Sequence, residues 1–263
     1  MNKTIIHVWT HKTSNLQRTD IENFWGLGDI IRGTIKMYFL SKKMNFNLIV
    51  DIQHHPISKF LKIQTHEYSN LILENKNNIE FVFPGYVETY INNNNSDILF
   101  FFTNDHYTHD ITNDCKVFIK NLLTPNDEFK IFFDNKIKEL PFEIFNILHF
   151  RLGDDEMIRN ENISLSLFDI NYNNLINNHE ENDVLISDSI HFKKYIKDKI
   201  DIFMFDTKVG HFGFHTDEKS LKDTLFEFFI ISKATKIKSF SVYSWKSGFV
   251  KIISEIYNIP IVT

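Results

Sequence analysis

Short apolar runs alternate along this chain with longer segments in which apolar residues recur at every third or fourth position. The short runs predict buried strands at 5–9, 47–52, 80–83, 98–102, 145–148, 184–188, 200–205, 237–242 and 259–262. The longer segments predict helices at 30–43, 56–61, 117–123, 128–138, 165–177, 190–196, 221–234 and 248–257. Because strands that alternate with helices form βαβ units, the pattern predicts an α/β fold built on parallel sheets.

The alternation falls into two blocks, one on each side of Pro141. We expect two Rossmann-like lobes with a cleft between them, an N-terminal lobe at 1–141 and a C-terminal lobe at 142–263. The asparagine-rich stretches at 75–78 and 92–95 are expected to be loops that connect these elements.

The composition is that of a soluble globular protein, because 43% of the 263 residues are hydrophobic and 24% are charged. A net charge of −5 argues against a general nucleic-acid-binding protein. We find no signal peptide and no stretch apolar enough to cross a membrane, so a cytoplasmic location is expected. The single cysteine, Cys115, excludes an intramolecular disulfide and is expected to be a small buried residue.

An arginine follows the apolar run in the middle of the chain, in the hexapeptide His-Phe-Arg-Leu-Gly-Asp at 149–154. A parallel strand that ends there places Arg151 at the carboxyl edge of its sheet, where open α/β folds bind ligands. A guanidinium is always charged and pairs with phosphate through two hydrogen bonds, so Arg151 suits a diphosphate. The alternative is an arginine in a surface salt bridge.

A glycine-rich turn leads into the first predicted helix. Glycines at Gly26 and Gly28 would let a phosphate or a sugar approach the backbone near a helix N-terminus. The alternative is a tight turn in which Asp29 caps the helix. The turn lacks the third glycine of a dinucleotide fingerprint and the Gly-Lys-Ser/Thr of a P-loop.

Two polar segments in the second block are further candidates. Ser187 and Asp188 follow a predicted strand and could hold a ribose or a base, or cap the helix that starts at Ile190. Glu227 lies on an otherwise apolar helix, before the hydroxyl-rich segment 239–248. A buried acid needs partners, and a guanine edge offers two N–H donors; the alternative is a Glu227 that faces solvent.

Histidine pairs at 54–55, 106 and 109, and 211 and 215 could suggest a metal site. None of them belongs to an HExxH-type helix, and no cysteine assists them. We therefore expect no structural or catalytic metal. The loop that carries the last pair could instead contact a polar ligand.

Four motifs, taken in order, resemble the fucosyltransferase superfamily, which includes α1,2-, α1,6- and protein O-fucosyltransferases. They are a Gly-x-Gly-Asp turn, a central His-x-Arg-x-Gly-Asp segment, a Ser-Asp strand end, and an acidic residue followed by Ser-x-Tyr-Ser. They stand at 26–29, 149–154, 187–188, 227 and 241–244. They span nearly the whole chain. Among the members of this superfamily, the chain most resembles compact viral or bacterial enzymes that build surface glycans.

The resemblance implies a GT-B architecture and an inverting glycosyltransferase that needs neither a metal nor another cofactor. Its donor would be a nucleotide sugar, GDP-fucose above all, and its acceptor a glycan hydroxyl. Arg151 would then neutralise the diphosphate leaving group. His149 and Glu227 would face the base and the ribose, while Ser241 and Ser244 would hold phosphates. Ser187, Asp188 and Tyr243 would also belong to the donor-binding residues.

By the same resemblance, the turn at Gly26 and Gly28 would approach the donor sugar, with Asp29 and Arg32 near the reacting centre. An inverting transfer also needs a general base within hydrogen-bond reach of the acceptor hydroxyl. The candidates are Asp29, Asp154, Asp155 and Glu156. Other readings stay open: a UDP-pentose donor, a sugar-nucleotide epimerase or hydrolase, and a non-catalytic protein that binds a nucleotide or a glycan.

Overall fold

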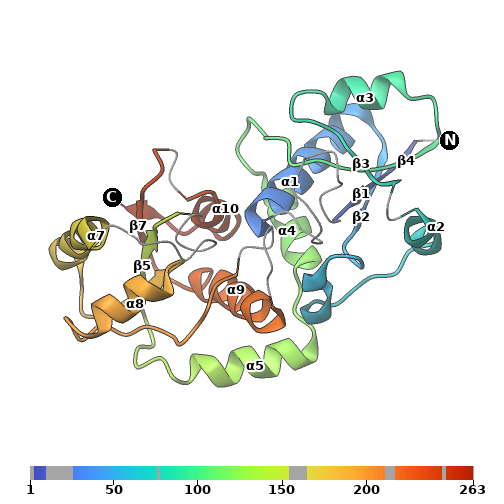
Figure 1. Ribbon diagram of the computed structural model, residues 1–263. Helices are drawn as coiled ribbons and strands as arrows, with labels where there is room; N and C mark the ends of the chain where they lie inside the picture. The colour runs from blue at the N-terminus through green and yellow to red at the C-terminus, as the bar shows by residue number, and fades with distance from the viewer. Residues whose placement is uncertain are drawn as a thin grey trace. The chain divides into compact units, whose positions relative to one another are not determined.

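The computed structural model describes residues 3–9, 26–75, 78–153, 165–210, 217–244 and 247–262. These residues form an α/β protein with two compact units, the first ending at Asn126 and the second starting at Asp127 (Figure 1). Each unit has its own sheet, and every strand in both sheets is parallel to its neighbours. The fold class predicted from the sequence is therefore confirmed.

The sheet of the first unit has the strand order β2-β1-β4-β3. Its strands span Thr4–Val8 (β1), Asn47–Asp51 (β2), Glu80–Phe81 (β3) and Ile98–Phe102 (β4). The helices of this unit are α1 (Leu27–Met44), α2 (Ser69–Glu74), α3 (Val87–Asn93) and α4 (Asn113–Leu122), with a 3₁₀ turn at Pro56–Phe60.

Helices α1 and α3 cover the same face of this sheet. Met37 and Leu40 of α1 and Val87 and Ile91 of α3 are buried in one cluster with apolar residues of β1 and β4. This is the arrangement that right-handed crossovers require, because β1–α1–β2 and β3–α3–β4 advance in the same direction across the sheet.

The sheet of the second unit has the strand order β6-β5-β7-β8. Its strands span Asn146–Arg151 (β5), Asp183–Ser187 (β6), Ile237–Ser241 (β7) and Ile261–Val262 (β8). The helices are α5 (Asp127–Ile137), α7 (Leu165–Asn178), α8 (Ile190–Lys197), α9 (Glu218–Ile231) and α10 (Gly248–Tyr257).

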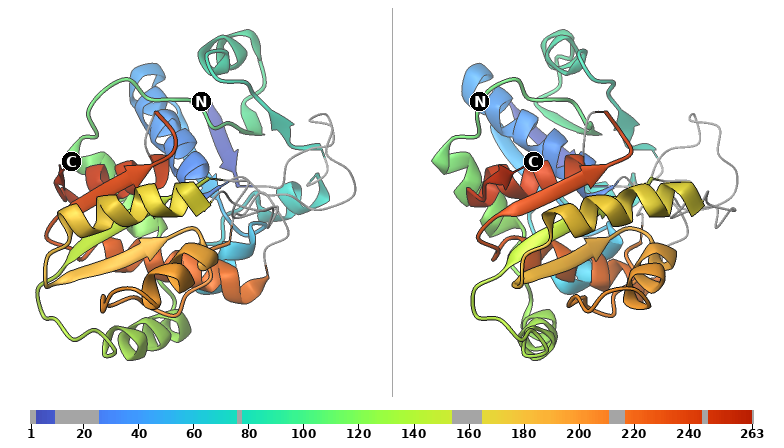
Figure 2. Two further views of the ribbon diagram at one scale, coloured as in Figure 1. Left: turned by 60° about the vertical axis from the view of Figure 1, so that its left-hand side comes forward. Right: turned by 90° about the vertical axis from the view of Figure 1, so that its left-hand side faces the viewer.

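Both faces of the second sheet are covered by helices, as Figure 2 shows. On one face, Phe168 of α7 and Phe192 of α8 pack against Phe150 of β5. On the other face lie α9 and α10, which meet through Phe228 and Phe249. Strand β5 is followed by a helix on the first face and its neighbour β7 by a helix on the second. The order of the strands thus reverses between β5 and β7.

Helix α5 belongs to the second unit by its contacts. Phe129 and Phe133 of α5 pack against Phe229 of α9 at ring-centroid distances of 5.9 and 6.2 Å. The chain therefore passes from one unit to the other before α5, whereas the sequence pattern placed the boundary at Pro141.

Most predicted elements are found within a few residues of their expected bounds, with three exceptions. The segment 200–205, expected to be a strand, forms only an isolated bridge between Phe203 and Val184. Helices α2 and α3 were not predicted, and α3 includes Asn92 and Asn93 of a stretch expected to be a loop. In the described ranges no helix is both long enough and apolar enough to cross a bilayer.

Candidate functional site

The point where the strand order reverses brings two predicted site residues together. Arg151, the last residue of β5, is the register partner of Ser241, the last residue of β7. The helices that follow these two strands lie on opposite faces of the sheet. In open α/β sheets, this is the position at which ligands bind.

Arg151 has an anionic and an aromatic neighbour. Its guanidinium Nη1 donates a hydrogen bond to the carboxylate of Asp188, which follows the adjacent strand β6. The guanidinium also lies 5.8 Å from the ring centroid of Tyr243, within cation–π range. The side chain of Arg151 is 18% exposed, so it forms part of the surface at the sheet edge.

Asp188 holds the turn that follows β5 in place. Its Oδ1 accepts a hydrogen bond from the N–H of Leu152 at 2.8 Å, and its Oδ2 accepts one from the N–H of Gly153 at 3.2 Å. Burial raises the pKa of Asp188, and the charge of Arg151 opposes this rise. We expected Asp188 to contact a ribose or a base. In the structure, its carboxylate orients Arg151 and the turn that follows it.

Gly153 shows why glycine stands in this turn. Its φ of +112° lies in a region that residues with a side chain rarely adopt. A Cβ atom there would also approach the hydroxyl of Tyr243 to 3.3 Å. The turn after β5 and the segment after β7 therefore pack closely at the predicted site.

His149 is buried in the second unit, on β5 and two residues before the end of that strand. Its imidazole is 4% exposed and shares a 3.0 Å hydrogen bond between Nδ1 and the hydroxyl of Ser239. Burial, assisted by the charge of Arg151, lowers the pKa of His149 to about 3. The ring is therefore neutral at physiological pH, and it lies on the same side of β5 as Arg151 because strand residues alternate in direction.

The hydroxyl groups near the sheet edge mainly bind the backbone. Ser189 caps α8 by accepting a hydrogen bond from the N–H of Phe192, and Ser187 accepts one from the N–H of Ser189. Ser241 accepts one at 3.1 Å from the N–H of Tyr243. Ser244 is exposed. The capping alternative for the segment that follows β6 thus describes Ser189, whereas Ser187 and Asp188 do not cap α8.

Glu227 is buried, and its carboxylate has two protein partners. It accepts a hydrogen bond from the Nζ of Lys193 at 3.2 Å and one from the hydroxyl of Thr207 at 2.5 Å. Burial raises the pKa of Glu227, and the charge of Lys193 opposes this rise. The expectation that a buried acid needs partners is met here by residues of the chain itself.

Lys193 is a residue that the sequence analysis missed. It lies on α8 next to the buried Phe192 and is only 6% exposed, and its Nζ also donates to the carbonyl and the hydroxyl of Thr207. Its position three residues before Ile196, on the apolar face of the helix, is the signal that could have identified it.

The glycine turn of the first unit is the start of α1. Gly26 is the N-cap residue, so Gly28 and Asp29 already lie in the first helical turn. Asp29 makes no capping hydrogen bond; its carboxylate pairs with the guanidinium of Arg32 at 2.5 Å. Arg32 also donates from Nε to the carbonyl of Asn104 at 3.4 Å.

Gly33 is a second glycine that the sequence analysis did not single out. A Cβ atom at this position would lie 1.9 Å from the carbonyl oxygen of Thr103, which follows β4. Only glycine lets the backbone of α1 approach the end of β4 so closely. Gly33 therefore fixes the position of α1, and with it that of Arg32.

Several predicted residues lie outside the described part of the chain. They include the general-base candidates Asp154, Asp155 and Glu156 and the histidines at 211 and 215. Within the described part, no three histidine, cysteine, aspartate or glutamate side chains are grouped so that they could hold a metal ion. Arg151, Asp188, Ser241 and Tyr243 form the candidate site that the structure does describe.

The fold is similar to those of solved fucosyltransferases. The NodZ α-1,6-fucosyltransferase soaked with GDP-fucose superposes with a TM-score of 0.58 at 9% sequence identity, over 97% of this chain and 93% of that chain. NodZ from Bradyrhizobium gives a TM-score of 0.54 at 11% identity, covering 96% and 93% of the two chains. A mutant of Arabidopsis thaliana FUT1 in complex with GDP gives 0.58 at 8% identity, covering 99% and 70%.

POFUT1 in complex with GDP also matches, with a TM-score of 0.52 at 10% identity, over 99% of this chain and 98% of that chain. No protein-family model and no curated protein matches the sequence. At these identities the comparisons establish the fold, which is the two-unit α/β fold of these fucosyltransferases. The fold expected from the motif resemblance is therefore confirmed.

Proposed function

We propose that this protein is a glycosyltransferase that transfers fucose from GDP-fucose to a hydroxyl group of a glycan. The observation that carries the proposal is the position of Arg151 at the reversal of strand order, directly opposite its register partner Ser241 on the neighbouring strand. The fold adds support, because solved proteins with this fold include fucosyltransferases with GDP or GDP-fucose.

In the proposed reaction, the acceptor oxygen attacks the anomeric carbon of the sugar while the bond from that carbon to the diphosphate oxygen breaks. The electron pair of the broken bond leaves with GDP, and the configuration of the anomeric carbon inverts. The proton of the acceptor hydroxyl passes to a general base. Asp29, Asp154, Asp155 and Glu156 remain the candidates for this base.

Arg151 would stabilise the negative charge that develops on the departing diphosphate. The role of Asp188 would be to hold the guanidinium and the turn at Leu152 and Gly153, so that little reorganisation is needed during the reaction. No metal ion takes part in this proposal, because Arg151 supplies the positive charge. A chelator should therefore leave turnover intact, and activity that is lost with EDTA and restored by Mn²⁺ would refute this part.

The preference for a guanine nucleotide was first based on Glu227, but the contacts of Glu227 no longer support it. The carboxylate of Glu227 is engaged by Lys193 and Thr207, so it gives no reason to prefer guanine over another base. The preference rests on the solved proteins of this fold that carry GDP or GDP-fucose. A UDP-pentose donor is the alternative that a binding experiment must test.

The test begins with calorimetric binding of GDP, UDP and ADP, followed by incubation with GDP-fucose and a panel of glycans. Tight binding of GDP and a fucosylated product would support the proposal. Sugar release without an acceptor would indicate a hydrolase, and GDP binding without turnover a binding protein. Tighter binding of UDP would indicate another donor.

Two substitutions connect this activity with the site. Arg151→Ala should lower kcat/KM by at least a hundredfold, since removing one charge-stabilising group costs about 3 kcal/mol in the transition state. Arg151→Lys keeps a positive charge beside Asp188 and tests the role of the planar fork. Lys251→Ala, at a 69% exposed lysine of α10, is the control and should leave turnover unchanged. Normal turnover in Arg151→Ala would overturn the assignment.

A further inference from the structure

Residues 206–210 of the second unit belong to no helix or strand, and we refer to them as the strap. The segment before the strap lies beside the edge strand β6 and is parallel to it, with Phe203 bridged to Val184. Thr207 comes four residues after Phe203, just as Asp188 comes four residues after Val184. The strap therefore leaves the sheet at the carboxyl edge, where Asp188 orients the arginine of the candidate site.

Two side chains of helix α9 bind the backbone of the strap. Asp223 accepts a hydrogen bond from the N–H of Lys208 at 3.0 Å, and the hydroxyl of Thr224 accepts one from the N–H of Gly210, also at 3.0 Å. Asp223 is 3% and Thr224 is 5% exposed, although both residue types usually face solvent. The strap is thus fixed to α9 at two points by buried polar groups.

The beginning of the strap is bound by helices from both faces of the sheet. Lys193 of α8 donates a hydrogen bond from Nζ to the carbonyl of Thr207 at 3.1 Å, and the hydroxyl of Thr207 donates one to Glu227 of α9 at 2.5 Å. Lys193 lies one turn after Ser189, the N-cap residue of α8, and Ser189 directly follows Asp188. The contacts therefore form a continuous path from the carboxylate at the candidate site to the strap.

The polar character of these contacts bears on what they do. Burying an ion pair costs desolvation free energy, and apolar side chains of the same volume are often at least as stabilising. A buried network whose hydrogen bonds are satisfied instead fixes one arrangement of the groups that it joins. The main effect of the side chains around the strap is therefore on the position of its backbone.

The composition of the strap suits the nucleoside part of a nucleotide sugar better than the diphosphate. Its one cation, Lys208, is balanced by Asp206 in the strap and lies 3.7 Å from the carboxylate of Asp217. Val209 and Gly210 are half-buried and offer apolar surface and backbone groups. A base and a ribose make contacts of this kind, whereas phosphate oxygens pair with cations.

We propose that four side chains around the strap are positioning residues of the nucleotide-sugar site: Lys193, Asp223, Thr224 and Glu227. They hold the strap so that its exposed side contacts the nucleoside, while Arg151 binds the diphosphate. Glu227 acts through Thr207 and does not itself contact the base. This inference rests on the proposed function, because it assigns roles within the same site.

The first experiment measures by calorimetry the dissociation constants of GDP and of inorganic pyrophosphate for the full chain. Thr224→Val removes the hydroxyl that holds Gly210 and should weaken GDP binding about tenfold, the effect of one lost hydrogen bond. Pyrophosphate has no nucleoside, so its binding should stay unchanged in this variant. Thr224→Ser keeps the hydroxyl and should bind GDP like the parent chain.

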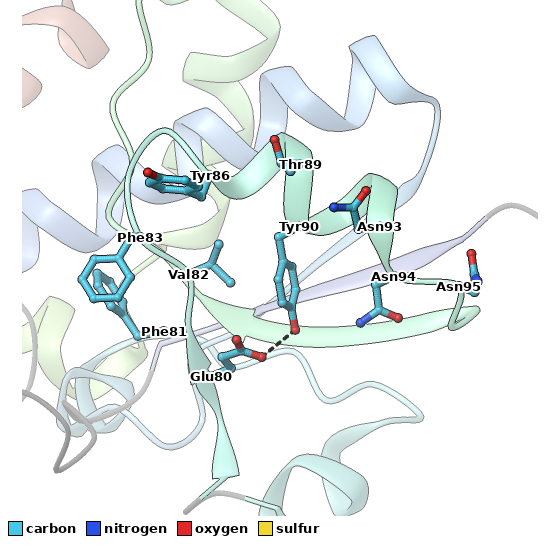
Figure 3. A pocket seen from close by; sticks show the side chains of 10 residues that line it. All are labelled: Glu80, Phe81, Val82, Phe83, Tyr86, Thr89, Tyr90, Asn93, Asn94 and Asn95. Carbon is cyan, nitrogen blue, oxygen red and sulfur yellow. Dashed lines mark hydrogen bonds between the residues drawn. The ribbon is translucent and has the colours of Figure 1, made fainter.

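Two further variants control for a loss of stability alone. Thr235→Val removes a hydroxyl that donates to the carbonyl of Phe145 at 2.8 Å, at the amino edge of the same sheet. Tyr90→Phe removes a hydroxyl that donates to Glu80 at 2.8 Å, in a groove of the first unit shown in Figure 3. Both variants should bind GDP like the parent chain, and thermal unfolding compares their stability with that of Thr224→Val.

The second experiment separates positioning from direct contact at Glu227. Inosine diphosphate lacks the 2-amino group of GDP, so a carboxylate that contacts the guanine edge would favour GDP over inosine diphosphate. If Glu227 only positions the strap, Glu227→Gln should leave the ratio of the two dissociation constants as it is in the parent chain. A preference for GDP that disappears in Glu227→Gln would show direct contact and overturn the role assigned to this residue.

The remaining outcomes distinguish this inference from the proposed function. Unchanged GDP binding in Thr224→Val, or equal weakening of GDP and pyrophosphate, would overturn the inference. If GDP binding is lost in Arg151→Ala but not in Thr224→Val, the inference fails and the proposed function stands. If the parent chain binds no GDP, both fail together.

Discussion

Arg151 and Asp188 form an ion pair that joins the ends of two neighbouring strands, β5 and β6. The carboxylate also accepts hydrogen bonds from the backbone of Leu152 and Gly153, so one side chain organises both the cation and the turn. The hexapeptide at 149–154 predicts the position of Arg151 at the strand end. Its orientation depends on Asp188, which directly follows the adjacent strand β6.

Replacing Asp188 should therefore weaken the fold as well as the site. Asp188→Ala removes the carboxylate that accepts hydrogen bonds from Arg151 and from the N–H groups of Leu152 and Gly153, and it should lower the free energy of unfolding by about 3 kcal/mol. Urea denaturation measures this change. Lys236→Ala, which breaks the exposed pair between Lys236 and Glu180, is the control and should cost less than about 1 kcal/mol. Equal effects of the two substitutions would contradict the organising role of Asp188.

The buried pair of Lys193 and Glu227 makes a second prediction, which a double-mutant cycle tests. Lys193→Met leaves the carboxylate of Glu227 buried with only Thr207 as a partner and should destabilise the protein by about 3–5 kcal/mol. Adding Glu227→Gln removes the stranded charge and should restore a large part of this loss. If the double variant is as unstable as the sum of the two single variants, the two side chains are not coupled.

The third prediction concerns acid. Burial lowers the pKa of His7 to about 4 and the pKa of His149 to about 3, both from an ordinary value of 6.5. Below pH 6.5 the unfolded chain therefore binds protons that the folded chain does not, and stability falls as the pH falls towards 4. Each histidine should contribute about 2 kcal/mol of loss between pH 7 and pH 5.

The measurement for this prediction is urea denaturation at pH 7 and at pH 5. The variant that combines His7→Asn with His149→Asn lacks both groups, so its loss over this interval should be smaller than that of the parent chain by about 4 kcal/mol. Groups common to both proteins cancel in the comparison. A variant with the same pH dependence as the parent would show that these rings titrate normally in the folded state.

The fourth prediction compares two glycines. Gly33→Ala places a Cβ atom 1.9 Å from the backbone oxygen of Thr103, so α1 or β4 must move, and we expect a loss of about 2–3 kcal/mol. Gly248→Ala introduces the same atom in a helix where nothing lies within 4 Å. It should be neutral or stabilise the fold by up to about 1 kcal/mol. Thermal unfolding of both variants provides the comparison.

The parts of the fold that the sequence predicted well are those in which burial and periodicity agree. The run 98–102 is strand β4 and the segment 248–257 is helix α10, with the bounds expected for each. The run 200–205 is also mostly apolar, with five apolar residues and Asp201, but it passes beside the edge strand β6 and makes one bridge there, at Phe203. A local pattern identifies an apolar segment but not the number of neighbours with which it pairs.

Helix α3 was missed for a related reason. Its sequence is rich in asparagine and has only two buried apolar residues, Val87 and Ile91, so its packing on the sheet outweighs its weak local preference. Among the candidate site residues, the positions at strand ends could be predicted, and Arg151 and Ser241 do meet there. The partners of Asp188 and Glu227 could not, because they come from elements distant in the sequence.

The contact between Lys193 and Glu227 has a mechanical consequence for the second unit. Helix α8, which carries the lysine, packs on one side of the sheet with α7, while α9, which carries the glutamate, packs on the other side with α10. A bond between opposite charges thus fastens the two outer layers to each other around the strands. If one pair of helices unfolded alone, it would leave an unpaired charge in the apolar interior. The second unit should therefore unfold cooperatively.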